Sequence, residues 1–496
     1  MFQTPLNILL RWHPQDAPFR LMALLYAFAG LCHLWLADAW IPEWIVGNAL
    51  FLAGILALPY SPSLLPWASC ALGKALPLLM GRDHLNQSLL LMLIAAAALL
   101  LCALGGWRAA RQSAALARDE KAFDLDALLH APANSDAPAL TDAFLIFVRG
   151  LTAAVYAMSA FHKLNRDFID PTLSCASYGV EKLAAYLNVS LSDLPAGLLL
   201  RQQAPMLVIG AELSIALLYV TGRRKAALLI ALLFHIPLTL TMAPAFAFVM
   251  LIGHAAFLSA ADLRVFAERG RRFAPAIIAV AIAMTALTTW MHGGTDDWTM
   301  LPREALLWAL LVWVALTPLP PRAIGRPTLP GQPTSRAARG LATLAVGLYL
   351  LHALTPYLGL RFQHTAAMVS NLRIDQGCWN HLVMPERWRL SDEYIRIDRV
   401  YFREPGFIAE YEDKVLDQLW NTTQVRQMRR NWCRDEVRPF FVEGTWRGAH
   451  FTIDDLCADP LPWPFERAGV FGEEVFEDHL RFQRNLPRTC PAACIH

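Results

Sequence analysis

The stretch FLIFVRGLTAAVYAMSA, residues 144–160, runs directly into Phe161-His162-Lys163-Leu164-Asn165-Arg166-Asp167-Phe168, and together they decide the fold. The first part is apolar and supplies most of the length of a membrane-spanning helix, which needs about 20 such residues. Lys163 then stands at the end of this helix. An ionisable side chain at membrane depth is costly, so we expect it to be functional.

Lys163 has two interpretations. A lysine buried beside apolar neighbours has its ammonium form disfavoured and can serve as a base. Lysines near helix ends also commonly extend their stems along lipid and keep the charged head in water. The spacing alone favours this second interpretation, and the sequence leaves both open.

The composition indicates a polytopic membrane protein. Of the 496 residues, 56% are hydrophobic and only 17% are charged, and the mean hydropathy is +0.36. These values do not fit a soluble globular chain. The formal net charge of +2 is spread thinly, so nothing indicates a nucleic-acid partner. No cleavable signal-peptide pattern opens the chain, and we expect the N-terminus to be retained.

Apolar runs near the spanning length predict about nine to eleven transmembrane helices. The expected ranges are 19–37, 44–58, 64–81, 88–106, 141–160, 198–220, 226–242, 244–260, 274–291, 304–318 and 340–357.

Lysine and arginine predict the orientation, because cytoplasmic loops carry an excess of both. The basic residues of the expected loops are Arg108, Arg111, Arg118 and Lys121, then Arg223, Arg224 and Lys225, then Arg264, Arg269, Arg271 and Arg272, and last Arg322, Arg326, Arg336 and Arg339. With the expected helices, all these loops lie on the cytoplasmic side together with the N-terminus. The Lys163 stretch, the turn at 81–84 and the chain after about residue 357 then lie outside.

The chain changes character after Pro356, where tryptophan, arginine and acidic residues replace the apolar runs. We therefore expect a transmembrane helical domain over 1–357 and a C-terminal cap of about 140 residues over 358–496. Alternation over 394–401 predicts a strand, and 410–433 is typical of a helix. The predicted fold class is an all-α polytopic membrane domain with a small α+β extracytoplasmic cap.

Five of the nine cysteines lie in the expected cap, which suits an oxidising compartment. They are Cys378, Cys433, Cys457, Cys490 and Cys494. We expect disulfides that involve Cys433, Cys457 and one or both terminal cysteines, and the odd number predicts at least one unpaired thiol. Cys490 and Cys494 do not have zinc-hook spacing and have no histidine cluster nearby, so no metal site is predicted.

Two histidines are candidate functional residues, and each also has a purely structural interpretation. His235, inside an apolar run, is either a ligand or a packed residue bonded to a neighbouring helix. His84 follows Asp83 just before a helix at the outer interface, where it either orients a base or is a solvated turn residue. No Gly-rich phosphate loop, nucleophile elbow or HExxH helix is present.

Several further motifs stand in a fixed order along the chain. They are Asp83-His84, Arg149-Gly150, Lys163-Leu164-Asn165-Arg166-Asp167-Phe168, Phe234-His235, Tyr349-Leu350-Leu351, Pro356-Tyr357, Met368-Val369-Ser370-Asn371-Leu372 and Trp379-Asn380-His381. In this order they resemble the vitamin K-dependent γ-glutamyl carboxylase family and its bacterial relatives, the proteins with an HTTM (horizontally transferred transmembrane) domain. The likeness extends from about residue 80 to residue 455.

This resemblance implies an integral membrane enzyme that uses a reduced naphthoquinone, with oxygen and carbon dioxide as cosubstrates and no metal. A buried lysine deprotonates the reduced quinone, and reaction with oxygen generates a strong base that removes a γ-proton from a substrate glutamate. The resemblance thus implies either carboxylation of a protein or peptide, or quinone epoxidation alone. A propeptide-guided carboxylase is not expected, because the animal enzymes have a longer C-terminal part.

The resemblance also implies roles for single residues. Lys163 corresponds to the lysine base, and His84 to the histidine that assists it. The residues implied to bind the quinone are Arg149, His162, His235 and Asn371. His162 stands where the carboxylase has a second lysine. On a continuing helix Asp167 would share a face with Lys163 and favour the charged lysine.

The expected partners are membrane lipid, a lipid-soluble quinol and a secreted protein or peptide substrate. The expected location is the inner membrane of a bacterium. The alternative is a non-catalytic membrane protein, such as an assembly factor or transporter, that retains the fold, since fold does not fix function.

Overall fold

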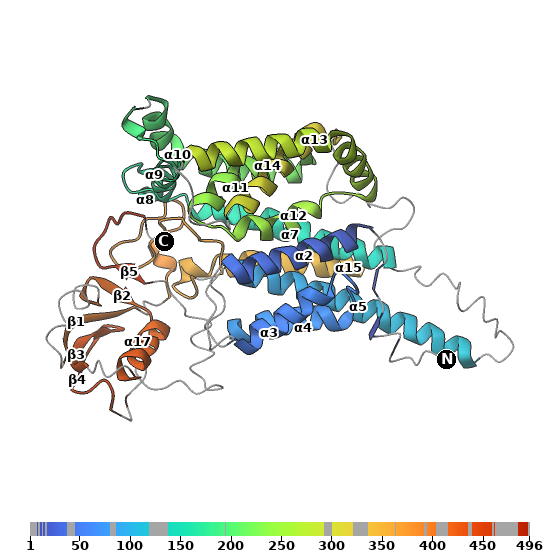
Figure 1. Ribbon diagram of the computed structural model, residues 1–496. Helices are drawn as coiled ribbons and strands as arrows, with labels where there is room; N and C mark the ends of the chain where they lie inside the picture. Colours follow the sequence, from blue (N-terminus) through green and yellow to red (C-terminus); the bar gives the residue numbers. More distant parts are fainter. Residues whose placement is uncertain are drawn as a thin grey trace.

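Figure 1 shows a computed structural model of the chain, in which a bundle of long helices carries a small sheet at one end. The structure describes residues 7, 10–11, 13–14, 17–36, 45–79, 86–118, 137–193, 195–291, 300–320, 336–362, 364–390, 394–402, 415–434, 439–458, 461 and 485–494.

Each apolar range expected from the sequence coincides with a helix. These helices are α2 (Ala17–Leu36), α3 (Ile45–Ala57), α4 (Leu64–Leu79), α5 (Asn86–Arg118), α7 (Ala137–His162), α10 (Pro195–Val220), α11 (Arg224–Thr241), α12 (Phe246–Ala255), α13 (Ala260–Met291), α14 (Met300–Leu316) and α15 (Arg336–Ala353). Two helices that we did not expect, α8 (Arg166–Ile169) and α9 (Cys175–Tyr186), follow α7.

By length and composition, 6 helices of the described chain could cross a membrane, namely α2, α5, α7, α10, α11 and α13. This number indicates a multi-pass membrane protein. The shorter apolar helices, among them α3, α4 and α12, are 10–17 residues long. The larger number of crossings expected from the sequence therefore stays a prediction.

Two of the expected basic loops are helical instead. Arg108, Arg111 and Arg118 lie inside α5, and the arginines between 264 and 272 lie inside the first half of α13. Arginine is a good helix former, so a change from apolar to basic residues ends the apolar run without ending the helix. The apolar run thus predicted the presence of these helices but not their ends.

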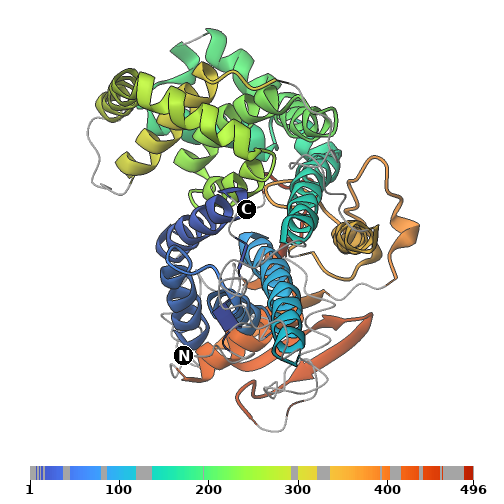
Figure 2. The same ribbon diagram turned by 90° about the vertical axis from the view of Figure 1, so that its right-hand side faces the viewer.

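Figure 2 shows α2 to α5 gathered on one side of the bundle and α10 to α14 on the other. The helix α7 packs against α5, α10, α12 and α15 and thereby contacts both groups. Much of its side-chain surface is buried for this reason, from Phe144 to Lys163. Residues 144–162 thus belong to the central helix of the molecule.

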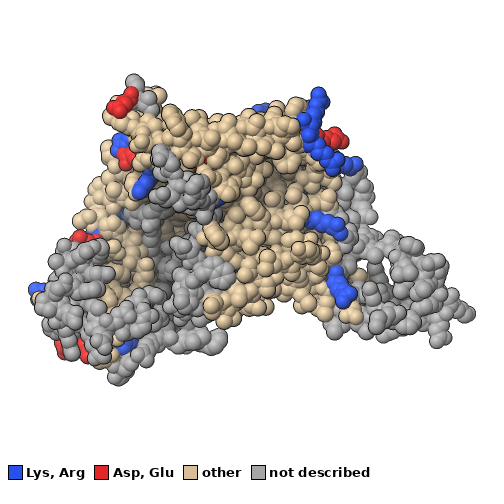
Figure 3. Space-filling view, viewed as in Figure 1, with Lys and Arg blue, Asp and Glu red and all other residues tan. Residues whose placement is uncertain are grey.

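Charged side chains are sparse over the bundle and gather toward its ends. In Figure 3 the largest visible group of Lys and Arg atoms lies at the end of the bundle opposite the C-terminal sheet. The wide tan surface between the two ends suits contact with lipid, because charged side chains are costly there.

The C-terminal part contains a small antiparallel sheet. Its strands are β1 (Ile395–Phe402), β2 (Gln418–Trp420), β3 (Pro439–Trp446), β4 (Ala449–Ile453) and β5 (Leu486–Pro487), in the order β4-β3-β1-β2-β5. The strand expected over 394–401 is confirmed as β1. The helix expected over 410–433 is right only in part, because β2 precedes α17 (Thr422–Arg434) within that range.

Asn421 separates β2 from α17. Its side-chain oxygen accepts a hydrogen bond of 2.9 Å from the backbone N–H of Gln424, which is the geometry of an N-cap. The apolar face of α17, with Val425, Met428 and Trp432, packs on β1 and forms a separate small core.

Three disulfides join Cys433 to Cys457, Cys378 to Cys490, and Cys175 to Cys494. The expected pairing of Cys433, Cys457 and both terminal cysteines is confirmed. The expected unpaired cap thiol is wrong, because Cys175 at the start of α9 supplies the missing partner. The free thiols Cys32, Cys70 and Cys102 all lie in apolar helices.

The segment 364–384 joins the bundle to the sheet and packs against the end of α7. The backbone N–H of Leu382 donates to Leu164 O over 2.9 Å, and that of Arg166 donates to Asn380 O over 3.0 Å. This junction surrounds Lys163.

Candidate active site

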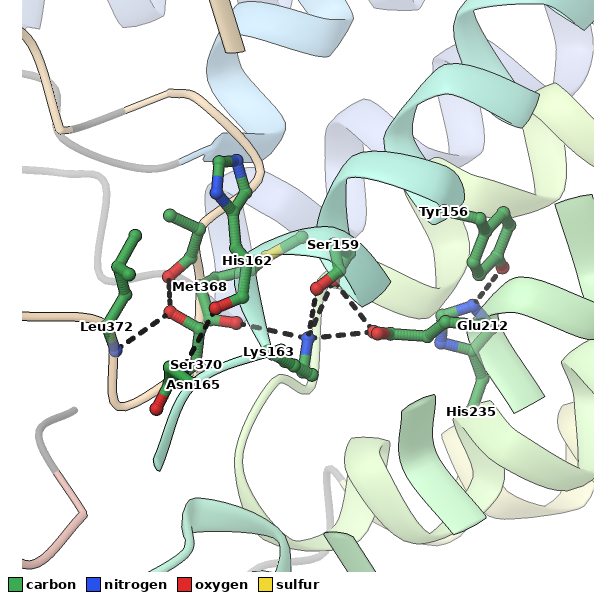
Figure 4. Close-up of polar contacts among 11 residues, drawn as sticks. Tyr156, Ser159, His162, Lys163, Asn165, Glu212, His235, Met368, Ser370 and Leu372 are labelled. Carbon is green, nitrogen blue, oxygen red and sulfur yellow. Dashed lines mark hydrogen bonds and ion pairs between the residues drawn. The ribbon is translucent and has the colours of Figure 1, made fainter. Parts of the chain in front are cut away.

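Lys163 is the first residue after α7 and is buried, with 3% of its surface exposed. Its Nζ donates to Ser159 Oγ over 2.7 Å and to Glu212 Oε1 over 2.9 Å, and Met368 O lies 3.5 Å away (Figure 4). The interpretation that favoured a lysine head held in water is therefore wrong. Lys163 points into the protein because α7 is central and α10 offers a carboxylate there.

Glu212 is the residue that the sequence interpretation missed. It is 4% exposed, and its Oε1 also accepts a hydrogen bond of 2.8 Å from Ser159 Oγ. Its other oxygen, Oε2, is buried and has no hydrogen-bond partner in the described part of the chain. A signal was present, since Glu212 is the sole acidic residue in the sequence of α10, and an isolated carboxylate in an apolar helix is expensive.

The polar face of α7 is built by helical spacing. Tyr156, Ser159 and Lys163 are three and four residues apart, so they lie above one another on one face of the helix. This face meets Glu212 of α10, which packs against α7. Ser159 contacts both charged side chains and thus fixes the lysine relative to the carboxylate.

Beside the pair lies a small apolar cluster. It contains Phe168 and Ile209, with Leu164 and Val369 packed against them. The Nζ of Lys163 lies 5.8 Å from the centre of the Phe168 ring. The charged pair therefore has an apolar boundary on this side, which strengthens its electrostatic interactions relative to water.

The segment that covers Lys163 has an unusual backbone. His364, Ala366, Val369 and Asn371 all have positive φ angles, between 53° and 66°. Such conformations are uncommon for residues with a Cβ and persist only where the surrounding structure imposes them, often at functional sites.

Two asparagines hold this segment in place. Asn165 Nδ2 donates to Ser370 O over 2.6 Å, and Asn371 Oδ1 accepts from the backbone N–H of Cys175 over 2.8 Å. Asn371 Nδ2 also donates to Leu173 O over 3.0 Å. Asn371 thus positions backbone next to Lys163.

The side chain of His162 contacts other residues than that of Lys163, although the two are adjacent in sequence. Its Nε2 lies 2.9 Å from Thr365 O, which can only accept, so Nε2 carries the proton. Its Nδ1 then accepts the hydroxyl of Tyr357 over 2.8 Å. His162 supports the covering segment rather than the amine of Lys163.

His381 holds the end of α7 to the junction. Its Nε2 donates to Phe161 O over 3.0 Å, and its Nδ1 accepts from the backbone N–H groups of Val383 and Met384. Acceptance at Nδ1 requires the neutral ring. Burial lowers the pKa of His381 below its usual range, which agrees with this assignment.

Asp167 does not pair with Lys163. Because α7 ends at His162 and Asn165 caps α8, the two residues do not share a helical face. Asp167 accepts hydrogen bonds from Asn380 and Ala492, and burial raises its pKa. The expectation that it favours the charged lysine is therefore wrong, and Glu212 takes this role.

The remaining candidates are spread along the bundle. Arg149 donates to Ala256 O over 2.7 Å and precedes Lys163 by about 21 Å of helix. His235 Nε2 lies 2.6 Å from the hydroxyl of Tyr156, one turn before Ser159. The structure thus brings Asn371 and Tyr156, with His235, toward the Lys163 end of α7 and leaves Arg149 near the middle of that helix. His84 lies outside the described residues.

A second buried lysine was also missed. Lys74 of α4 is 1% exposed, and its Nζ lies 2.9 Å from His33 Nε2. Ser88 Oγ lies 3.2 Å from His33 Nε2. The centre of the Phe51 ring lies 4.6 Å from Lys74 Nζ. Lys74 and His33 both lie inside apolar runs, whose sequence pattern indicates only membrane-spanning helices.

No known family model, curated protein or solved structure matches this chain. The resemblance to the carboxylase family thus stays a prediction from the motifs quoted above. Within the described residues, no group of three His, Cys, Asp or Glu side chains could hold a metal ion.

Proposed function

We propose that this chain is an integral membrane enzyme in which Lys163 and Glu212 act as one acid–base pair on a lipophilic hydroxyl compound, specifically a reduced naphthoquinone. The observation that carries the proposal is the 2.9 Å contact between Lys163 Nζ and Glu212 Oε1 in the interior of the protein. Two ionisable groups this close take up and release protons as a pair rather than singly.

Two features of the site suit such a substrate. Glu212 Oε2 has no hydrogen-bond partner among the described residues, so it can accept a hydroxyl proton. Leaving this oxygen unpaired costs about 1–3 kcal/mol, which a bound hydroxyl would remove. The apolar cluster around Phe168 offers a surface for a ring system beside the charged pair.

The proton then moves to the pair. Before the transfer Lys163 and Glu212 hold one exchangeable proton between them, and afterwards they are an ammonium and a carboxylic acid. Lys163 stays charged beside the deprotonated oxygen and stabilises its negative charge, as preorganised cations do in water-poor sites. Ser159 forms hydrogen bonds with both side chains and so fixes their relative position. A bound reduced quinone would supply the electrons for reaction with oxygen.

The proposed orientation has support from two sources. The three disulfides lie at the sheet and at α9, and disulfides persist in oxidising compartments. The largest visible group of Lys and Arg lies at the opposite end, as expected for a cytoplasmic face (Figure 3). We therefore propose an N-terminus in the cytoplasm and a C-terminal cap, 358–496, outside a bacterial inner membrane. A secreted glutamate-containing peptide would meet the site from that side.

A non-catalytic function is the second candidate, and one observation favours it. Lys163 Nζ has an acceptor for each ammonium hydrogen, in Ser159 Oγ, Glu212 Oε1 and a backbone carbonyl. Such a pair can serve simply to tie α7 to α10.

The deciding experiment supplies purified protein in lipid with reduced naphthoquinone and oxygen and measures quinone epoxide. Wild type should form epoxide, whereas Lys163→Met and Glu212→Gln should not. Lys163→Arg keeps the positive charge that stabilises the deprotonated oxygen, so it should retain more activity than Lys163→Met. Lys74→Met, which alters a buried lysine outside the pair, is the matched control and should stay active. Addition of a glutamate-containing peptide and carbon dioxide then tests for carboxylation.

Absence of epoxide with every quinol would leave the non-catalytic candidate, whereas activity of Lys163→Met equal to wild type would remove Lys163 from the proposed mechanism.

A further inference from the structure

A continuous chain of hydrogen bonds joins four helices behind the Lys163–Glu212 pair. The hydroxyl of Tyr219 in α10 lies 2.6 Å from His254 Nδ1 in α12, and His254 Nε2 lies 3.0 Å from the hydroxyl of Tyr156 in α7. The same hydroxyl lies 2.6 Å from His235 Nε2 in α11. All four side chains are buried, with at most 2% of their surface exposed.

The donor and acceptor roles along this chain of hydrogen bonds can be arranged in two ways. In the first, His235 Nε2–H donates to Tyr156, Tyr156 donates to His254 Nε2, and His254 Nδ1–H donates to Tyr219. In the second, Tyr219 donates to His254 Nδ1, His254 Nε2–H donates to Tyr156, and Tyr156 donates to His235 Nε2. Both orders leave every ring neutral and satisfy all three hydrogen bonds. The two imidazoles always carry their protons on opposite nitrogens.

The His235 end of the chain carries a nitrogen that can take up a further proton. His235 Nδ1 is buried and has no hydrogen-bond partner among the described residues, which is also true of Glu212 Oε2. Tyr156 is one helical turn from Ser159, which bonds Glu212. Figure 4 draws this arrangement along the shared face of α7.

We propose that Tyr219, His254, Tyr156 and His235 form a proton relay that carries away the proton collected by Lys163 and Glu212. The inference rests on the proposed function, because that function requires the pair to return to its starting protonation state after each turnover.

The transfer balances at every atom. Glu212 Oε2 and His235 Nδ1 do not bond each other directly, so the proposal includes one water molecule that passes the proton of Glu212 to His235 Nδ1. The Nε2 proton of His235 then moves to the oxygen of Tyr156. Tyr156 passes its own proton to His254 Nε2, His254 passes its Nδ1 proton to Tyr219, and Tyr219 releases its original proton to a second water molecule. One proton enters and one leaves, no ring becomes charged, and the chain changes from its first order to its second.

A purely structural role would use the same bonds, because polar side chains also hold membrane helices together. The difference lies in whether the bonds reverse. A structural network keeps one order, whereas a relay has both orders and switches His235 and His254 together.

Histidine-selective ¹⁵N NMR of the full-length protein tests this without any substrate. Signals are assigned with His235→Asn and His254→Asn. In wild type the two rings should exchange between opposite tautomers, with populations that shift together in Glu212→Gln. Tyr156→Phe should uncouple them. Tyr26→Phe, which removes a different buried hydroxyl bond, to Leu91 O, should leave the coupling intact. One fixed tautomer for each ring in every variant would overturn the relay.

Turnover gives the second measurement. Tyr156→Phe should slow repeated turnover relative to the first turnover by about 100-fold, the lower end of the range for proton-transfer groups, and Tyr26→Phe should not. If the ratio of the repeated-turnover rate to the first-turnover rate is the same in Tyr156→Phe and Tyr26→Phe, the relay is overturned. If wild type forms no product, the proposed function fails. The NMR result still decides whether the hydrogen bonds between Tyr219, His254, Tyr156 and His235 reverse.

Discussion

Lys163 and Lys74 are both buried lysines, but they differ in the group that each would leave behind. Lys163 contacts a carboxylate, Glu212, at 2.9 Å. Lys74 contacts an imidazole, His33, at 2.9 Å. Loss of Lys163 leaves a buried negative charge without its partner, whereas loss of Lys74 leaves a ring that is neutral already. The comparison teaches that burial alone does not define a reactive lysine, and that the charge of its partner also decides.

Lys163→Met gives the largest expected effect on stability. It should lower the free energy of unfolding by about 3–5 kcal/mol, because breaking a buried pair leaves an uncompensated charge. The measurement is denaturant unfolding in a fixed detergent. The double variant Lys163→Met/Glu212→Gln should recover most of the loss. A double variant as unstable as the single one would show that Glu212 is not the group left unpaired.

Lys74→Met should cost less, about 1–3 kcal/mol, because it leaves a neutral ring with one hydrogen-bond partner fewer. The same unfolding measurement compares it directly with Lys163→Met. A second substitution, His33→Leu, should recover part of this cost, because it removes the ring that has lost its donor. A cost equal to that of Lys163→Met would break the distinction between the two lysines.

Asn371→Ala should lower the free energy of unfolding by about 1–2 kcal/mol, through loss of the hydrogen bonds to Cys175 N and Leu173 O. Asn371→Gly loses the same bonds but suits the positive φ of 53°, so it should be the more stable variant by about 1 kcal/mol. Equal stability of the two variants would mean that the backbone conformation relaxes when the side chain is removed.

His381→Gln should have the smallest effect, and the effect should depend on pH. The pKa of His381 is lowered in the folded protein, so the unfolded chain binds more protons and stability rises with pH. Its contribution is complete above the unfolded value of about 6.5 and declines as the pH falls below it. The difference in Tm between wild type and His381→Gln should therefore be larger at alkaline than at acidic pH. A constant difference would contradict this assignment.

The helices were predictable because each apolar run is long enough to require one, and β1 because its residues alternate. Helix ends were less predictable, since arginines continue α5 and α13 beyond their apolar parts. The end of α7 at His162 lies close to the expected end at residue 160, but α8 was not expected, because Asn165 caps it only once Phe168 has folded back toward it.

The partners of the candidate site were not predictable from local pattern. Glu212 lies 49 residues from Lys163, and His33 lies 41 residues from Lys74. A polar residue inside an apolar run indicates that some partner exists, but the helix packing decides which one. The pairing of Cys175 with a cap cysteine was missed for the same reason, because only the folded junction brings α9 beside the C-terminal segment.

The Cys175–Cys494 disulfide turns most of this protein into a ring. It joins residues 319 positions apart, so the bundle from α9 onward and the whole sheet lie within one closed covalent loop. A single backbone cut anywhere in that loop would open the ring without separating its pieces. Such a nicked chain would migrate as one species until a reductant is added, and only then as two. The covering segment beside Lys163 belongs to this ring, so it would stay attached to α7 through either arm.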